Sequence, residues 1–308
     1  MLSGAGEIVA SPHPERRMTR DELLAHVPGA HAIVSMLYDR IDAEVMDAAG
    51  PGLKVVANVA VGYDNIDVAA ARDRGVAVGN TPGVLTDATA DLAFGLLLTV
   101  TRRLGEGERL LRRREAWRWE LDFMLGSAIQ GELLGIVGLG EIGQAMARRA
   151  RAFGMEIAYA GRRPAPPAIE RDLGARRMPL DRLLAEARVV SLHCPLTAET
   201  RHLIDAAALA AMRDDAYLVN TARGPIVDEG ALVEALRHGR IAGAALDVFE
   251  REPDVEEGLL SLENVALAPH LGSATSETRA AMAMRAAENV AAVLGGRPAP
   301  SLVVDPGG

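Results

Sequence analysis

The sequence contains a single cysteine and very few aromatic residues. Cys194 is the one thiol in 308 residues, and aromatic side chains make up 3% of the chain. One cysteine excludes an internal disulfide and a metal cluster built on cysteines, and such scarcity is typical of a reducing compartment. We expect Cys194 to be a small buried apolar residue rather than a nucleophile. The lack of aromatics means that the core must be aliphatic and rich in alanine.

Long apolar runs and excess positive charge are also absent. No stretch approaches the ~18–20 apolar residues of a membrane-spanning helix, and residues 1–17 lack the apolar centre of a signal peptide. The formal net charge of −9 argues against nucleic acid or an anionic membrane as a partner. We therefore expect a cytoplasmic enzyme with more than one domain and no metal site.

From residue 133 onwards, short apolar runs alternate with amphipathic stretches. Continuous apolar strands separated by helices predict a parallel sheet that is covered on both faces. This is the pattern of a doubly wound α/β domain. The runs that we expect to be strands cover residues 133–138, 156–161, 189–195, 216–222, 243–249 and 264–269.

A second, smaller pattern of strands and helices occupies the first 80 residues, with expected strands at 31–37, 53–62 and 76–80. A long helix within residues 81–114 then begins with Thr86 or Asp87 as its N-cap, and its apolar face continues for many turns. A helix near the end of the chain is expected to cross back to the first domain, and residues 295–308 are interpreted as a tail. We predict a discontinuous domain of residues 1–81 and 275–308, and a second domain of residues 82–274.

A glycine motif follows the first strand of the larger domain. Gly138, Gly140 and Gly143 form the pattern G-x-G-x-x-G, with Leu139, Glu141 and Ile142 between them. The first glycine permits a tight turn, the second lets backbone approach a pyrophosphate, and the third allows close packing of helix on strand. The N-terminus of the next helix supplies free N–H groups to the diphosphate. The motif therefore predicts a dinucleotide-binding domain of the Rossmann type.

The second strand of this unit ends without the expected acid. An acid about 20 residues after the motif binds the adenosine ribose hydroxyls in domains that prefer NADH. Gly161, Arg162 and Arg163 occupy that position here. The glycine removes repulsion of a 2′-phosphate, and the arginines donate charge-assisted hydrogen bonds to it. The alternative is a solvated basic turn. We predict NADPH as the preferred cofactor, with NADH as a weaker one.

Polar residues follow three other predicted strands. Arg223 follows one strand, Asp247 lies inside the next with Glu252 just beyond it, and His270 ends a third. Ligands of parallel sheets bind outside the carboxyl ends of the strands. An arginine fork holds a carboxylate, a histidine exchanges a proton with a carbonyl oxygen, and a glutamate orients the histidine ring. Each residue alone has a structural alternative, but together they suit hydride transfer to a 2-keto acid.

These motifs resemble the D-isomer-specific 2-hydroxyacid dehydrogenase family, and within it most closely the glyoxylate/hydroxypyruvate reductases. The resemblance covers nearly the whole chain and is carried by "VGYDNIDVAAARDRGVAVGNTPGVLTDATADLAFGLLL", "GIVGLGEIG", "SLHCPLTAETRHLI", "VNTARGPIVDEGAL", "LDVFEREP" and "PHLGSAT". It implies a flavodoxin-like small domain beside the Rossmann domain, with closure of the two domains over the substrate. It also implies homodimers that form through the nucleotide-binding domain.

The same resemblance implies roles for individual residues. Arg223 binds the substrate carboxylate and carbonyl, His270 is the acid/base, and Glu252 is its partner. The substrate is also held by backbone N–H groups of Val61 and Gly62, with Leu37 and Trp119 beside it. The residues that line the cofactor, besides the glycine motif and the Gly161–Arg163 turn, are Thr86, Cys194, Pro195, Thr200, Thr221, Ala222, Asp247, Gly272 and Ser273.

The sequence leaves several alternatives open. The first strand of the small domain is not apparent before residue 7, which would expose a sheet edge. Trp119 is either an interface residue or a residue that reaches the neighbouring subunit's active site. The 2-keto acid is not fixed by the sequence. Another D-2-hydroxyacid dehydrogenase, of the phosphoglycerate or phosphite type, and a dinucleotide-sensing corepressor-like protein remain as alternatives.

Overall fold

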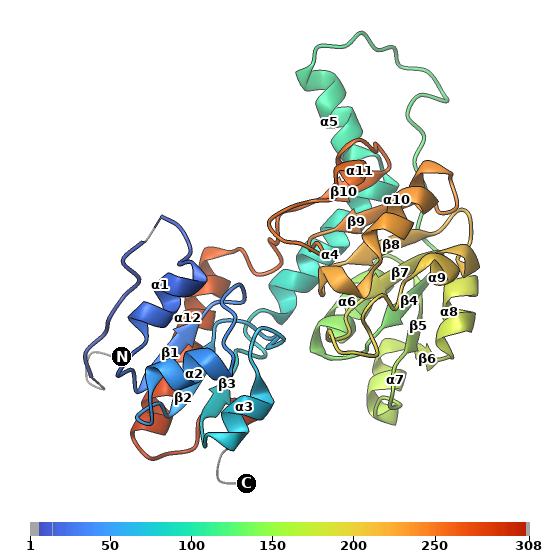
Figure 1. The fold of residues 1–308 in the computed structure, drawn as a ribbon. Helices are drawn as coiled ribbons and strands as arrows, with labels where there is room; N and C mark the ends of the chain where they lie inside the picture. The colour runs from blue at the N-terminus through green and yellow to red at the C-terminus, as the bar shows by residue number, and fades with distance from the viewer. Residues whose placement is uncertain (1–5, 14, 306–308) are drawn as a thin grey trace. The chain divides into compact units, whose positions relative to one another are not determined.

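The structure is a computed structural model that describes residues 6–13 and 15–305. The chain divides into two compact units, each built around its own sheet (Figure 1). Unit 1 comprises Met1–Leu85 and Thr275–Gly308, and unit 2 comprises Thr86–Ala274. Both are α/β units, and in the described part of the chain no helix is long and apolar enough to cross a bilayer.

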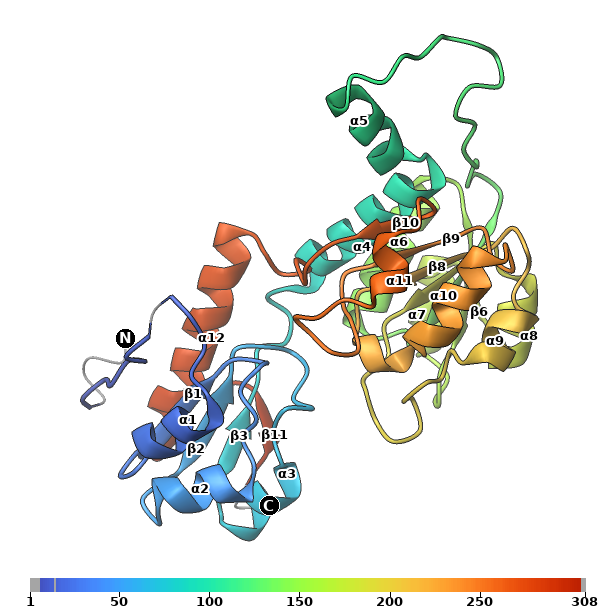
Figure 2. The ribbon, with the colours of Figure 1, turned by 45° about the horizontal axis from the view of Figure 1, so that its top comes forward.

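Unit 1 contains a four-stranded sheet in the order β1-β2-β3-β11. The first three strands are parallel, and β11 runs antiparallel to β3 (Figure 2). Its helices and strands are α1 (Arg20–His26), β1 (Ala32–Ser35), α2 (Ala43–Ala49), β2 (Val55–Asn58), α3 (Val68–Asp73), β3 (Ala77–Gly79), α12 (Ser276–Leu294) and β11 (Leu302–Val304).

Helices cover the sheet of unit 1 on both faces. One core combines apolar residues of α1, α2 and α3 with Ile33, Val56, Val78 and Val304 from the four strands. Side chains alternate along a strand, so the intervening residues face the other side, where α12 packs on β1, β2 and β3. The helices begin at polar caps, including a capping box between Thr19 and Glu22.

The structure corrects two expectations for unit 1. The interpretation of residues 295–308 as a tail is wrong for the described part, because residues 302–304 form β11 and Val304 is buried at 2% exposure, while residues 306–308 lie outside the described residues. The expected strand 53–62 ends at Asn58, where pairing with both neighbours stops and the chain turns. Among the described strands, β1 lies at the edge of the sheet opposite β11, and Val34 on β1 is 49% exposed.

Unit 2 contains a parallel sheet in the order β10-β9-β8-β7-β4-β5-β6. The order reverses between β4 and β7, which makes the carboxyl ends of these two strands the topological switch point. Its elements are α4 (Thr86–Thr101), α5 (Leu104–Arg112), β4 (Leu133–Val137), α6 (Glu141–Ala152), β5 (Glu156–Ala160), α7 (Pro167–Leu173), β6 (Ala175–Arg177), α8 (Leu180–Glu186), β7 (Val189–Leu192), α9 (Ala206–Ala211), β8 (Tyr217–Asn220), α10 (Glu229–Arg237), β9 (Gly243–Leu246), α11 (Glu257–Leu260) and β10 (Val265–Leu267).

Two apolar cores lie on the two faces of this sheet. One contains residues of α8, α9 and α10, and the other contains residues of α4 and α6. The fully buried strands β4, β7, β8 and β9 explain the continuous apolar runs in the sequence. This confirms the predicted doubly wound domain.

The start and end of the predicted long helix differ from the expectation. Thr86 and Asp87 lie in the first turn of α4 rather than at its N-cap, and the helix stops at Thr101. Arg103 has a left-handed backbone (φ 52°) and precedes the separate helix α5. In Figure 1, α5 and the chain after it extend away from the sheet of unit 2. Asp247 lies one residue beyond β9 rather than inside it, because pairing with β8 ends at Leu246.

The burial of β11 gives a stability prediction. Val304→Ala should lower the free energy of unfolding by about 2 kcal/mol, since it removes buried methyl groups and leaves a cavity. Urea unfolding followed by circular dichroism measures this. The matched control Val34→Ala, on the half-exposed edge of the same sheet, should change stability by less than about 0.5 kcal/mol. Equal effects of the two substitutions would contradict the role assigned to β11.

Candidate active site

The glycine motif forms a tight turn between β4 and α6. Gly138 has φ +94°, and a Cβ there would lie 2.8 Å from the backbone nitrogen of Cys194, which follows β7. A Cβ at Gly143 would overlap the carbonyl oxygen of Gly138. At Gly140 a Cβ would meet no atom within 4 Å, so open space lies above the N-cap of α6. Gly138 thus permits the tight turn, Gly143 permits close packing of α6 on that turn, and Gly140 leaves room for a ligand to approach the backbone.

This turn fits a dinucleotide diphosphate. It lies at the switch point, and the first intrahelical bond of α6 runs from Gln144 N–H to Gly140 C=O. The N–H groups of Glu141, Ile142 and Gly143 are therefore available to an anion. Thr221, just after β8 in the same sheet, has a buried hydroxyl with no partner in the described structure. Thr86 reaches the turn, where its hydroxyl donates to Glu141 at 3.3 Å.

The turn after β5 carries two arginines, and a third from β6 holds it in place. Gly161, Arg162 and Arg163 are exposed, and a Cβ at Gly161 would meet only the Arg163 carbonyl oxygen, at 3.7 Å. Arg177, at the end of β6, donates to the carbonyl groups of Gly161 and Arg162 at 2.9 and 3.3 Å. The hydroxyl of Tyr159, a buried residue of β5, accepts from Ala165 N–H at 2.7 Å. The basic turn is therefore braced from two sides.

The segment after β7 closes against the glycine turn. Thr200 donates its hydroxyl to the Pro195 carbonyl at 2.7 Å and accepts from Thr197 N–H at 2.7 Å. The Cys194 backbone abuts Gly138, and burial raises the pKa of its thiol to about 11. A thiol with this pKa is protonated at neutral pH and is a poor nucleophile, as expected, although Cys194 is partly rather than fully buried.

His270 and Glu252 form a direct pair at the carboxyl end of the unit 2 sheet. Nδ1 of His270 lies 2.8 Å from Oε2 of Glu252, and the other oxygen of Glu252 accepts from Phe249 N–H at 3.0 Å. The His270 backbone is left-handed (φ +55°), a conformation that is strained for a histidine. Its N–H donates to the Asp247 carbonyl at 2.8 Å. The ring is thus held through Nδ1, which leaves Nε2 for a ligand.

The side chain of Asp247 holds the backbone of the two residues that follow His270. This side chain is 1% exposed, and its two oxygens accept from Leu271 N–H at 2.6 Å and Gly272 N–H at 2.8 Å. Burial raises the pKa of Asp247, and the two N–H groups oppose that shift. Gly272 and Ser273 therefore lie in a turn that Asp247 fixes, beside the start of α4 at Thr89.

Arg223 follows β8 and lies close to the same pair. Asn220 donates to the Arg223 carbonyl at 2.9 Å and accepts from Ala222 N–H at 3.1 Å. The next residue, Gly224, packs so tightly that a Cβ would overlap the carbonyl carbon of Phe249. Burial opposes ionisation of Glu252, but the hydrogen bond from His270 and the charges of His270 and Arg223 lower its pKa below the usual value. The three predicted residues therefore share one region of unit 2.

The other predicted substrate residues belong to other parts of the chain. Leu37, Val61 and Gly62 belong to unit 1, in the loops that follow β1 and β2. Trp119 belongs to the segment after α5, and it is 80% exposed. In the same segment Trp117 and Phe123 stack with ring centroids 5.8 Å apart.

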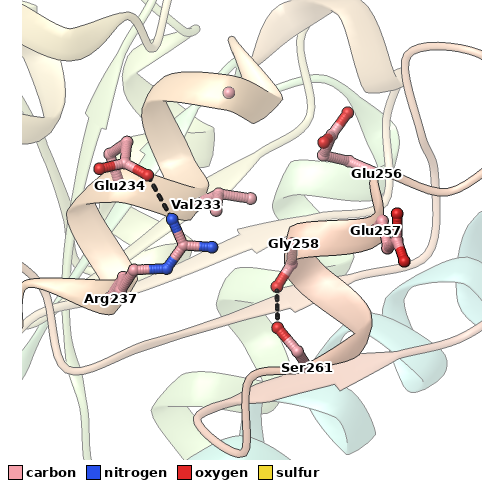
Figure 3. Close-up of a pocket in the computed structure, with 8 residues that line it drawn as sticks. Val233, Glu234, Arg237, Glu256, Glu257, Gly258 and Ser261 are labelled. Atoms are coloured by element: carbon pink, nitrogen blue, oxygen red, sulfur yellow. Dashed lines mark hydrogen bonds and ion pairs between the residues drawn. The ribbon is translucent and has the colours of Figure 1, made fainter.

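A separate pocket of about 510 Å³ lies between α10 and α11 (Figure 3). None of the predicted site residues lines it. Three of its charged side chains have partners, since Arg237 pairs with Glu234 and Glu256 pairs with Arg251. Among the described residues, no three histidine, cysteine, aspartate or glutamate side chains gather as metal ligands would.

Sequence reasoning missed Arg177, Asn220, Asn58 and Asn80. All four hold backbone carbonyl groups in the loops just described or in those of unit 1. For the three asparagines, the available signal was a polar residue that ends or follows an apolar strand, whereas Arg177 ends the short polar strand β6 and has no such signal. Their acceptors, however, are main-chain atoms that no sequence pattern marks.

Comparison with known proteins identifies a family model and similar enzymes. Residues 94–272 match the family model "D-isomer specific 2-hydroxyacid dehydrogenase, NAD binding domain". A glyoxylate reductase of Thermococcus onnurineus is 52% identical over 94% of this chain and 87% of its own, and one of Thermococcus kodakarensis is 51% identical over 98% and 91%. The solved NADPH-dependent glyoxylate/hydroxypyruvate reductase of Sinorhizobium meliloti, in complex with NADP and malonate, has a TM-score of 0.82 and is 40% identical over 94% and 87%.

The contrast between two glycines of the motif is a test of the dinucleotide site. Gly140→Ala should leave the unfolding midpoint within about 2 °C of the parent, because a Cβ there meets no protein atom, yet weaken dinucleotide binding about tenfold or more by filling the approach. Gly143→Ala should lower the midpoint by several degrees, because the Cβ overlaps Gly138. Calorimetric titration and thermal unfolding measure both. Unchanged binding by the Gly140 variant would contradict the assignment.

Proposed function

The chain belongs to the D-isomer-specific 2-hydroxyacid dehydrogenase family and is an NAD(P)-dependent oxidoreductase, and from this premise we propose that it reduces glyoxylate or hydroxypyruvate to the D-2-hydroxy acid, with NADPH as the preferred cofactor. The observation that carries the proposal is the His270–Glu252 pair beside Arg223, at the carboxyl end of the sheet that bears the glycine turn. The relatives named glyoxylate reductase support the choice of substrate.

Each of the three side chains has a distinct role in this proposal. The nicotinamide cofactor supplies the hydride. Arg223 binds the substrate carboxylate and polarises the C2 carbonyl, since a guanidinium offers two parallel donors. His270 holds a proton at Nε2 for the carbonyl oxygen, and Glu252, bonded to Nδ1, fixes the orientation of the ring. The lowered pKa of Glu252 keeps that carboxylate ionised for this purpose.

The N–H groups of Val61 and Gly62 are proposed to bind the substrate carboxylate as well. They follow β2 in unit 1, and in the structure as described they donate to no protein acceptor. Consecutive free N–H groups of this kind form anion sites in many loops. Leu37, in the loop after β1, is proposed to shape the apolar side of the substrate.

The preference for NADPH follows from the turn after β5. No carboxylate stands at Gly161, and Arg162, Arg163 and the bracing Arg177 concentrate positive charge there. A 2′-phosphate dianion gains charge-assisted hydrogen bonds from such a turn, whereas the ribose hydroxyls of NADH find no acid acceptor. The related Sinorhizobium meliloti enzyme, which is described as NADPH-dependent, supports this assignment.

A homodimer is proposed through α5 and the segment that follows it. This part of unit 2 exposes an unusual number of large apolar side chains for a protein in water, which marks an interaction surface. Trp119 is placed at that interface. The exposed residues are Leu104, Leu111, Trp117, Trp119, Leu121, Phe123 and Leu125.

A cofactor swap tests the basic turn. The triple variant Gly161→Asp, Arg162→Ala, Arg163→Ala should lower kcat/KM for NADPH by about 100-fold and raise the NADH/NADPH ratio, because each lost bond to a charged group is worth about 1.5–3 kcal/mol. Steady-state kinetics with both cofactors measure the ratio. Arg176→Ala, which removes another exposed arginine of β6 that pairs with Glu156, is the matched control. An unchanged ratio in the triple variant would overturn the 2′-phosphate assignment.

A panel of 2-keto acids tests the reaction itself. Glyoxylate and hydroxypyruvate should give the highest kcat/KM with NADPH, and Arg223→Ala should reduce it by about 100-fold or more, as expected for loss of a donor that acts in the transition state. Arg237→Ala, in the pocket of Figure 3, is the control and should keep parental activity. If the parent binds NADPH but turns over no keto acid, the protein is a sensor and the proposed reaction is wrong.

A further inference from the structure

Three consecutive carbonyl groups after β2 are held by donors from other parts of unit 1. The Ala60 carbonyl accepts from Thr81 N–H at 2.9 Å, and the Val61 carbonyl accepts from the Asn80 side chain at 2.9 Å. The Gly62 carbonyl accepts from the side chain of Asn58, which is fully buried, at 2.8 Å. Two of the three donors come from adjacent residues, Asn80 and Thr81, directly after β3.

These bonds also set the direction of the N–H groups. A peptide unit is planar and trans, so its N–H points away from its carbonyl. The carbonyl of Ala60 shares a peptide with the N–H of Val61, and the carbonyl of Val61 shares one with the N–H of Gly62. The N–H of Val61 therefore points away from Thr81, and the N–H of Gly62 points away from the Asn80 side chain. In the described chain no protein group accepts from either.

Asn80 is itself fixed from the C-terminal part of unit 1. Its carbonyl accepts from Asn289 of α12 at 2.9 Å and from the Ser301 hydroxyl at 2.7 Å. Ser301 N–H in turn donates to Asn289 at 3.1 Å, and Asn289 is fully buried. Gly79 permits this approach, because a Cβ there would lie 2.8 Å from the Asn289 amide. The side chain of Asn80 therefore extends from a backbone that cannot shift freely.

We propose that Asn80 is a positioning residue for substrate binding, which by holding the Val61 carbonyl aims the Gly62 N–H at the substrate carboxylate. The inference rests on the proposed function, since it takes these N–H groups as carboxylate donors. Asn80 does not touch the substrate. It makes the donor pair rigid before binding, so that the substrate does not have to orient the loop. A ligand with a carboxylate next to a carbonyl or a second carboxylate is the class this arrangement recognises.

Substitution of Asn80 tests the inference in the full-length enzyme. Asn80→Asp keeps the size of the side chain but replaces the donor with an oxygen that repels the Val61 carbonyl. KM for glyoxylate should rise about 10- to 100-fold, the effect of one lost hydrogen bond to a charged group, with kcat changed much less. The inhibition constant of malonate should rise by the same factor, while the dissociation constant of NADPH stays at the parental value.

The control must carry the same kind of bond outside the loop. Asn264→Asp is matched, because Asn264 of unit 2 also donates its amide to main-chain carbonyls, those of Leu236 and Ala242. It should leave KM and the malonate constant unchanged even where it lowers the unfolding midpoint. A merely structural role of Asn80 would likewise lower stability and leave both constants alone.

The outcomes separate the two proposals. If the Asn80→Asp enzyme is folded and keeps parental KM and malonate inhibition, the inference is wrong, while turnover by the parent and its loss in Arg223→Ala leave the proposed function standing. If Asn80→Asp does not fold, Ser301→Ala, which removes one of the two donors to the Asn80 carbonyl, decides instead. A rise of at least about threefold in both constants supports the inference, and parental values overturn it.

Discussion

The buried carboxylate of Asp247 is the constraint on which the unit 2 site depends. Two N–H groups that follow His270 donate to it, and His270 N–H donates to its backbone carbonyl. A histidine does not adopt a left-handed backbone without support, and these three bonds supply it. Burying a charge is costly unless it is hydrogen-bonded. The turn after His270 is therefore held tightly to the end of β9, because its release would leave a buried carboxylate without hydrogen-bond donors.

The same principle recurs at the other strand ends of both units. Asn220 holds the Arg223 backbone, Arg177 holds the basic turn, and Asn58 with Asn80 holds the loop after β2. In each case a side chain satisfies a main-chain group that has left the sheet ladder. The loops are thus ordered by hydrogen bonds within the protein, and binding does not have to supply the free energy of ordering them.

The sequence predicted the arrangement of elements better than their ends. Buried strands such as β4 and β8 are continuous apolar runs, so their existence and parallel pairing were readable. The short strands β6 and β11 were missed, because three residues give no period and a proline-rich approach favours a tail. The break at Arg103 was missed because the residues around it, Arg102 and Leu104, are good helix formers and do not mark a helix end. The glycine motif and the His270–Glu252 pair follow from local patterns, whereas Asn80 and Asn289, 209 positions apart, do not.

The division of unit 1 between the two ends of the chain has a consequence for biosynthesis. Its β3 pairs with β11 and its sheet packs against α12, and both of these elements are synthesised after unit 2. Unit 2 is continuous from Thr86 to Ala274 and is complete before them. Because domains fold as units from the N-terminus during synthesis, the first 85 residues must wait with one face of their sheet uncovered while the later-encoded unit matures. Unit 2 can therefore fold before unit 1 is complete. A nascent chain that stalls before residue 275 exposes one apolar face of the unit 1 sheet, and chaperones recognise such surfaces.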